Sequence, residues 1–286
     1  MINSIYKYNI YILLYYYIII LYIFNLIIVE NKAKKGRGVI VSLKKYIITG
    51  DILEVYEYSQ YLKGKGGSNR TTEKSEDIEK SLLNYSNTNQ RRRDTVRRLA
   101  CCNFNSKYDK FFTLTFAENL QNVKECNVIF KNFIKRLKYR FKEIDIKYLA
   151  VIEFQKRGAV HYHVLSNIPY IRVEELQELW GSGFVYINAI THVDNIGAYI
   201  VKYMTKDNTD LRLQGLKAYQ YSRNLKKPYK LINHDLKEFD ILEKKILKKY
   251  DLSNKVPIYE TIFDTEKLGS CEYKQYNFRR STDERI

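Results

Sequence analysis

The chain has 286 residues, of which 45% are hydrophobic and 14% aromatic, so it can build a sizeable core and is not a disordered tail. Its 49 Lys and Arg against 32 Asp and Glu give a net charge of +17, which favours a polyanionic partner, either nucleic acid or an anionic membrane surface. Its four cysteines form no C-x-x-C pair, which argues against a zinc ribbon or a disulfide framework and favours a reducing, cytoplasmic location.

The segment at residues 1–36 is strongly apolar. Its run from Ile10 to Val29 contains one strongly polar residue, Asn25, and is long enough to cross a bilayer as a helix. Basic residues follow the run, so the positive-inside bias would leave the rest of the chain in the cytoplasm. Alternatively, the run is translated upstream DNA, since its Ile, Leu and Tyr are what A+T-rich codons produce. Membrane association is therefore expected only if residues 10–29 are genuinely expressed.

Residues 37–98 read as an extension with a linker. Two segments, at 39–41 and 47–58, are rich in β-formers, and a polar, glycine-containing stretch from residue 64 to about residue 90 is typical of a flexible linker. A helix-compatible segment with five arginines follows. We expect it to contact a phosphate backbone, although a solvated helix face is the alternative. These arginines are Arg91, Arg92, Arg93, Arg97 and Arg98.

Residues 99–228 alternate between strand and helix patterns. The order is strand, helix, strand, strand, helix, strand, followed by one more helix, with a turn predicted at 155–158. This order predicts an α+β fold with a ferredoxin-like βαββαβ core, in which helices cover one face of an antiparallel sheet. The expected elements lie at 111–116, 130–141, 148–154, 159–166, 173–180, 184–190 and 195–205. The basic C-terminal extension, residues 229–286, contains a predicted helix around 236–250.

Two of the four histidines, His161 and His163, are separated by one residue on a predicted strand. Alternate side chains of a strand share a face, so both imidazoles would project together. Glu153 lies on the preceding strand of the same hairpin and is the natural third ligand. Two imidazoles and a carboxylate suit a catalytic divalent ion, and the carboxylate favours Mg²⁺ or Mn²⁺ over structural zinc. Alternatively, Glu153 pairs with Arg157 or Lys156.

A second group of polar side chains lies on the helix predicted at residues 195–205. Tyr199, Lys202, Tyr203 and Lys206 fall along one stripe at helical spacing. A tyrosine hydroxyl needs nearby positive charge or a base to act as a nucleophile, and Lys202 one turn away supplies charge. The pattern Y-x-x-K is a weak motif by itself, but it gains specificity beside an H-x-H strand.

Three blocks, in this order, resemble the three motifs of HUH endonucleases, and more narrowly the rolling-circle replication initiation proteins of bacterial plasmids and single-stranded DNA phages. The blocks are Phe112-Thr113-Leu114-Thr115-Phe116, His161-Tyr162-His163 and Tyr199-Ile200-Val201-Lys202. The stretch at residues 153–163 is especially similar. The resemblance covers roughly residues 99–228, and the apolar N-terminus has no counterpart in it.

This resemblance implies a metal-dependent endonuclease and strand transferase that starts rolling-circle replication. His161, His163 and Glu153 would bind Mg²⁺ or Mn²⁺, and Tyr199 would attack a phosphate of single-stranded origin DNA to form a 5′-phosphotyrosyl intermediate. The released 3′-OH would prime a host polymerase, with a host helicase as a further partner. Lys202 would stabilise the developing charge, and Tyr203 is a candidate second nucleophile or a DNA-stacking residue. Candidate DNA contacts are Thr113, Thr115, Arg157 and Lys206.

Two alternatives stay open from the sequence. One is a basic DNA-binding adaptor without catalysis that is held at the membrane by residues 10–29. The other keeps the chemistry and changes the biology, because HUH-type transposases and mobilisation relaxases use a related site. Relaxases of this kind tend to carry a third histidine in the cluster, which this chain does not have, so the residues favour replication.

Overall fold

The computed structural model describes residues 39–40, 43–59, 62–63, 78–204, 211–213, 215–233, 236–252, 254–265 and 268–279. The apolar run at 10–29 and Lys206 lie outside these described residues, so the predictions made for them stay predictions. Among the described helices, none is both long enough and apolar enough to span a membrane.

The first sheet has five antiparallel strands in the order β8-β5-β7-β6-β9. Its first four strands and two helices follow one another as βαββαβ, which confirms the predicted ferredoxin-like core, and β9 extends the sheet beside β6. In chain order these elements are β5 (Lys110–Phe116), α3 (Val123–Arg140), β6 (Tyr148–Phe154), β7 (Val160–Ser166), α4 (Val173–Trp180), β8 (Gly183–Asn188) and β9 (Tyr219–Tyr221).

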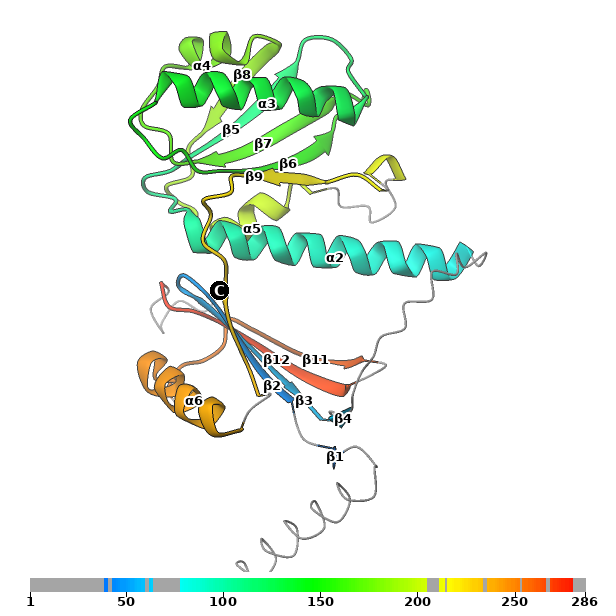
Figure 1. Ribbon diagram of the computed structural model, residues 1–286, viewed down its shortest axis with the longest axis vertical. Helices are drawn as coiled ribbons and strands as arrows, with labels where there is room; N and C mark the ends of the chain where they lie inside the picture. The colour runs from blue at the N-terminus through cyan, green and yellow to red at the C-terminus, as the bar shows by residue number, and fades with distance from the viewer. Residues whose placement is uncertain are drawn as a thin grey trace, which may run out of the picture.

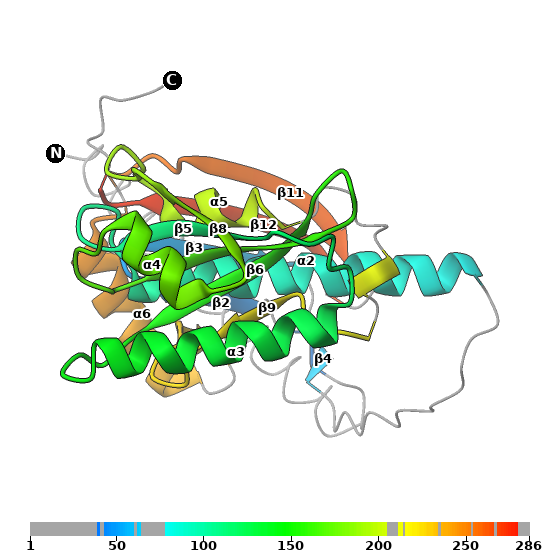
Figure 2. The same ribbon diagram turned by 90° about the horizontal axis from the view of Figure 1, so that it is seen from above.

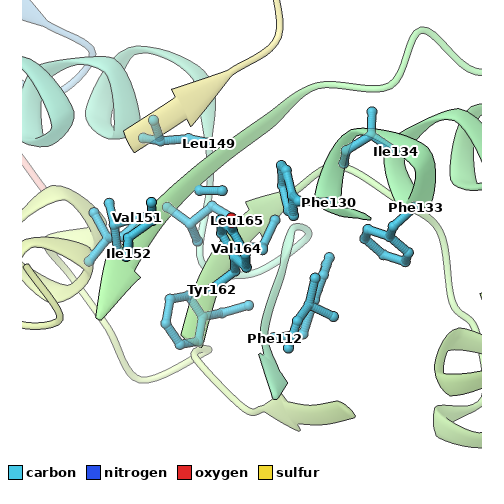
Figure 3. Close-up of a cluster of buried hydrophobic side chains, with 14 of the residues drawn as sticks. Phe112, Phe130, Phe133, Ile134, Leu149, Val151, Ile152, Tyr162, Val164 and Leu165 are labelled. Atoms are coloured by element: carbon cyan, nitrogen blue, oxygen red, sulfur yellow. The ribbon is translucent and has the colours of Figure 1, made fainter. Parts of the chain in front are cut away.

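Aromatic packing joins α3 to one face of this sheet. The α3 helix begins after Asn122, whose side chain accepts hydrogen bonds from two backbone N–H groups of the first turn. Its buried stripe includes Phe130, which stacks on Tyr162 of β7, and Phe133, which meets Phe112 of β5 edge-on (Figure 3). These rings are fully buried, and together they form the centre of the main hydrophobic core.

Two further helices, α2 (Ile78–Asn103) and α5 (Ile196–Val201), lie on the opposite face of the first sheet (Figure 1). The sequence analysis expected helices on one face only, which holds for the core helices α3 and α4. In both views α2 and α3 run in similar directions on opposite sides of the sheet (Figures 1 and 2). The stretch predicted as a linker up to about residue 90 is helical from Ile78, because no glycine or proline interrupts residues 78–103.

A second five-stranded antiparallel sheet has the order β10-β2-β3-β12-β11. Two of its strands come from before the core and three from after it, so the two predicted extensions fold together as one unit. This unit lies across α2 from the first sheet, with α6 on its far face (Figure 1). Its elements are β2 (Leu43–Thr49), β3 (Ile52–Tyr58), β10 (Tyr229–Ile232), α6 (Leu236–Tyr250), β11 (Tyr259–Thr265) and β12 (Gly269–Asn277).

A small apolar cluster holds α6 against the second sheet. Phe239 and Ile246 of the helix pack on Tyr46, Leu53 and other buried residues of the strands. The helix bounds agree with those predicted from the sequence, because its apolar residues recur at helical spacing between lysines. The remaining described elements are short: β1 (Val39–Ile40) pairs with β4 (Leu62–Lys63), and η1 (Leu211–Leu213) is a single turn.

Candidate metal centre and tyrosine helix

The hairpin formed by β6 and β7 places Glu153 directly opposite His161. Its turn lies where the sequence predicted it. Gly158, with φ of +91°, donates its backbone N–H to the Gln155 carbonyl oxygen at 2.8 Å, and Gln155 donates to the Ala159 carbonyl oxygen at 2.9 Å. A positive φ favours glycine, so this residue fixes the turn and with it the register that pairs the carboxylate with the histidine.

Glu153, His161 and His163 each offer one ligand atom, and these three atoms lie within 4.8 Å of one another. The His163 Nε2 atom is 2.5 Å from the Glu153 Oε2 atom. The His161 Nε2 atom is buried, and no hydrogen-bond partner for it is found in the described part of the chain. A buried ring nitrogen without a partner, next to a second imidazole and a carboxylate, fits a divalent cation.

The protonation state of His161 also suits a ligand. Burial, together with the neighbouring His163, lowers the pKa of His161 to about 4. The imidazole is therefore neutral at physiological pH and keeps a ring-nitrogen lone pair for a cation. The Glu153 carboxylate, whose side chain is 39% exposed, gives the cluster its opening to solvent.

Thr113 supports His163 from the neighbouring strand β5. It is the register partner of His163, and its Oγ1 atom lies 3.0 Å from His163 Nδ1. A hydrogen bond at Nδ1 leaves Nε2 to face the carboxylate and fixes the orientation of the ring. Thr115 is the register partner of His161, so both threonines share the face of the sheet that carries the cluster.

Helix α5 brings Tyr199 and Tyr203 to the same face. The helix begins at Asn195, whose side-chain oxygen accepts the Ala198 N–H at 2.9 Å. Tyr203, in the turn that follows the helix, stacks on His163 with ring centroids 4.0 Å apart. Its hydroxyl donates to the Tyr199 hydroxyl oxygen at 3.2 Å. The structure thus brings both predicted tyrosines next to the metal-ligand cluster.

The three polar residues of the predicted helix stripe differ in their surroundings. Burial, followed by the hydrogen bond to Tyr199, raises the pKa of Tyr203, so this hydroxyl stays protonated and acts as a donor. Lys202 is exposed, and its Nζ atom lies 5.9 Å from the centroid of the Tyr199 ring. The ammonium group is therefore free to move towards a bound anion beside Tyr199.

The arginines of α2 lie away from the metal-ligand cluster, and most of them make contacts within the protein. Arg92 donates to the Leu216 carbonyl oxygen at 3.0 Å, and Arg93 reaches the Met204 carbonyl oxygen at 3.5 Å. Arg97 and Arg98 both bind Glu54 of the second sheet, at 2.5 and 2.6 Å. Arg91 is exposed. These contacts indicate that the arginine row mainly holds α2 to its neighbours, and DNA contact by Arg91 stays a prediction.

Arg157 is exposed at the turn of the hairpin and supports it. Its guanidinium donates to the Phe116 carbonyl oxygen at 2.7 Å and to the Gln155 side chain at 2.7 Å. Glu153 does not pair with it among the recorded ion pairs of the described residues, where its partner is His163. The side chain thus ties the hairpin turn to the end of β5 while keeping its charge at the surface.

Two residues near the cluster were not singled out from the sequence. Phe111 packs against both Tyr199 and Tyr203, with ring centroids 5.0 and 5.2 Å away. Gly197 lets α5 approach α2, because a Cβ there would lie 2.4 Å from the Arg97 carbonyl oxygen. A glycine inside a helical pattern is a signal for such an approach, whereas Phe111 was hidden in an ordinary strand pattern.

The fold and this cluster define an α+β domain whose central hairpin can hold a divalent cation beside a pair of tyrosines. Residues 109–208 match a family model that describes replication-associated proteins of the ORF2 type. The match confirms the resemblance to replication-associated proteins over this segment, which contains all three motif blocks, and it supports a role in replication initiation. It does not extend to α2 or to the second sheet. No match was found among curated proteins or among solved structures.

Proposed function

We propose that this protein nicks and rejoins single-stranded DNA at a replication origin, with Tyr199 as nucleophile and Mg²⁺ or Mn²⁺ held by Glu153, His161 and His163. The observation that carries the proposal is the convergence of the three ligand atoms within 4.8 Å, with Tyr203 joining His163 to the Tyr199 hydroxyl through a ring stack and a hydrogen bond. The match to a replication-associated family over the same residues supports it.

The chemistry is a transesterification at one phosphate. A bound divalent cation would act as a Lewis acid towards a phosphate oxygen. The Tyr199 Oη atom forms a bond to phosphorus while the bond from phosphorus to O3′ breaks, so the 5′-phosphate stays on the tyrosine and O3′ leaves as a hydroxyl after taking up a proton. Attack by a 3′-OH on the phosphotyrosine reverses the step and rejoins DNA. The released 3′-OH is the primer that a host polymerase and helicase would use.

The neighbouring residues have distinct tasks in this step. Lys202 places an exposed positive charge beside Tyr199, where it offsets charge that develops on the phosphate. Tyr203 keeps its proton because burial raises its pKa, and it donates to the Tyr199 oxygen. A buried donor with a raised pKa is suited to orient the nucleophile, so we assign Tyr203 to positioning and not to a second cut.

A nicking assay on supercoiled DNA of the encoding replicon tests the assignment. In Mn²⁺ the wild-type protein should relax the DNA and stay covalently attached to it on a denaturing gel. Tyr199→Phe should give no adduct, whereas the matched variant Tyr203→Phe, which keeps the ring stack, should still form adduct at a reduced rate. An adduct with Tyr199→Phe would show that the nucleophile is another residue. Relaxation that persists in EDTA would rule out the metal.

A further inference from the structure

The edge strand β8 carries two large exposed aromatic side chains, Phe184 and Tyr186, which are 65% and 67% exposed. Phe184 is the register partner of Thr115, and Tyr186 is the register partner of Thr113. Register partners in an antiparallel sheet project from the same face. Because those threonines in turn pair with the two histidines, both aromatic rings lie on the face that carries the candidate metal centre.

The exposure is confined to this face of the strand. Val185, which lies between the two aromatic residues, points to the opposite face and is buried there. Helix α5 covers the sheet next to Phe111 and His163, yet two-thirds of each ring on β8 stays open to solvent. Isolated exposed apolar side chains are common, but a pair that continues a site across the sheet marks a binding surface.

Positive charge borders this pair. Arg157 is exposed and donates to the Phe116 carbonyl oxygen, and Phe116 is the register partner of Gly183, which directly precedes Phe184. A guanidinium next to two open aromatic faces is the combination that holds single-stranded nucleic acid, because the cation binds phosphate and the rings stack on bases of any sequence. The overall charge of +17 acts in the same direction.

We propose that Phe184 and Tyr186 form a stacking platform for unpaired DNA bases that flank the scissile phosphate, with Arg157 on the adjoining backbone. The proposal rests on the function proposed above and adds the place where the strand lies. Strand β8 is two strand spacings from β7, about 10 Å, so the platform holds neighbouring nucleotides and not the reacting one. The two rings are about 7 Å apart along the strand, so each can take a separate base.

Fluorescence anisotropy with a labelled single-stranded oligonucleotide in EDTA tests the platform, because the absence of divalent cations separates binding from nicking. Phe184→Ala and Tyr186→Ala should each weaken binding by about tenfold, and Tyr186→Phe should restore it. Tyr139→Ala is the matched control, since Tyr139 is 85% exposed on α3 at the other side of the sheet, and it should bind as wild type.

Unchanged affinity in both alanine variants would overturn the platform and leave the nicking proposal standing, since the Tyr199→Phe test does not depend on it. An equal loss in Tyr139→Ala would also overturn it, because the effect would then belong to surface aromatics in general. If the alanine variants bind DNA normally but shift the sedimentation coefficient of the protein, a second copy of the chain occupies β8 and the proposal is wrong.

Discussion

His163 is held at both ring nitrogens, which makes its environment the most constrained of the three candidate ligands. Nε2 faces the Glu153 carboxylate at 2.5 Å, and Nδ1 faces the Thr113 hydroxyl at 3.0 Å. The Tyr203 ring covers one face of the imidazole. A ring fixed in this way presents its nitrogen to a cation without a loss of side-chain freedom on binding, which is how outer hydrogen bonds raise metal affinity.

Replacing Thr113 tests this arrangement. Thr113→Val keeps the side-chain volume and removes the hydroxyl that orients His163, so we expect Mn²⁺ affinity to fall by about 10- to 100-fold. Isothermal titration calorimetry measures the affinity, and nicking at saturating Mn²⁺ should recover most of the wild-type rate. Thr113→Ser, which retains the hydroxyl, serves as the control. Equal affinity in Thr113→Val and wild type would show that the hydroxyl does not orient the ligand.

At the scale of elements, the position of α5 depends on a close approach to α2. Gly197 lies in the first turn of α5, and a Cβ there would lie 2.4 Å from the Arg97 carbonyl oxygen and 2.6 Å from the Cys101 Sγ atom. These distances are shorter than packed atoms allow. The glycine therefore sets how deeply α5 sits between α2 and the first sheet, and with it where Tyr199 lies.

Gly197→Ala should destabilise the protein by about 1–3 kcal/mol, the usual cost of overpacking a core. Helix propensity alone gives the opposite sign, because alanine stabilises a helix by about 1 kcal/mol relative to glycine. Urea unfolding monitored by circular dichroism measures the free energy of unfolding and separates the two effects by sign. A more stable Gly197→Ala variant would show that α2 and α5 do not approach this closely.

The core elements were predictable because their signals are local. The hairpin that carries His161 alternates in polarity on both sides of a turn with glycine, and these features fix its register and the place of Glu153. The second sheet was not predictable in this way. Its contact between Glu54 and Tyr273 joins residues 219 positions apart, and no local pattern encodes such a pairing. For the same reason the sequence could show a basic stripe on α2 but not the carboxylate that faces it.

At the scale of the whole molecule, one buried carboxylate connects the two sheets through α2. Glu54 of β3 has no exposed surface, and it accepts hydrogen bonds from Arg97 and Arg98 of α2 and from Tyr273 of β12. Toward the first sheet, Arg93 of the same helix reaches the Met204 carbonyl oxygen, next to Tyr203. The row of arginines thus links the second sheet to the segment that carries the tyrosines.

The pKa of Glu54 makes this connection dependent on pH. Burial by itself would raise that pKa, but the hydrogen bond from Arg98 and the charge of Arg97 outweigh burial and hold it at about 2. A carboxyl group with a lowered pKa in the folded state stabilises the fold fully above its unfolded value, near 4.5, and loses this contribution as the pH falls towards 2. The interaction is therefore complete at neutral pH and weakens only in acid.

Glu54→Gln should lower the free energy of unfolding by about 3 kcal/mol at pH 7, because it leaves two buried guanidinium groups without a counterion. Denaturant unfolding of both proteins from pH 7 to pH 2 should show this difference shrinking below pH 4.5. The matched control is Glu57→Gln on the same strand, since Glu57 is 44% exposed in a 3.6 Å pair with Lys44 and should change stability by less than about 1 kcal/mol. A Glu54→Gln variant as stable as this control at pH 7 would mean that the buried carboxylate does not hold the two sheets to α2.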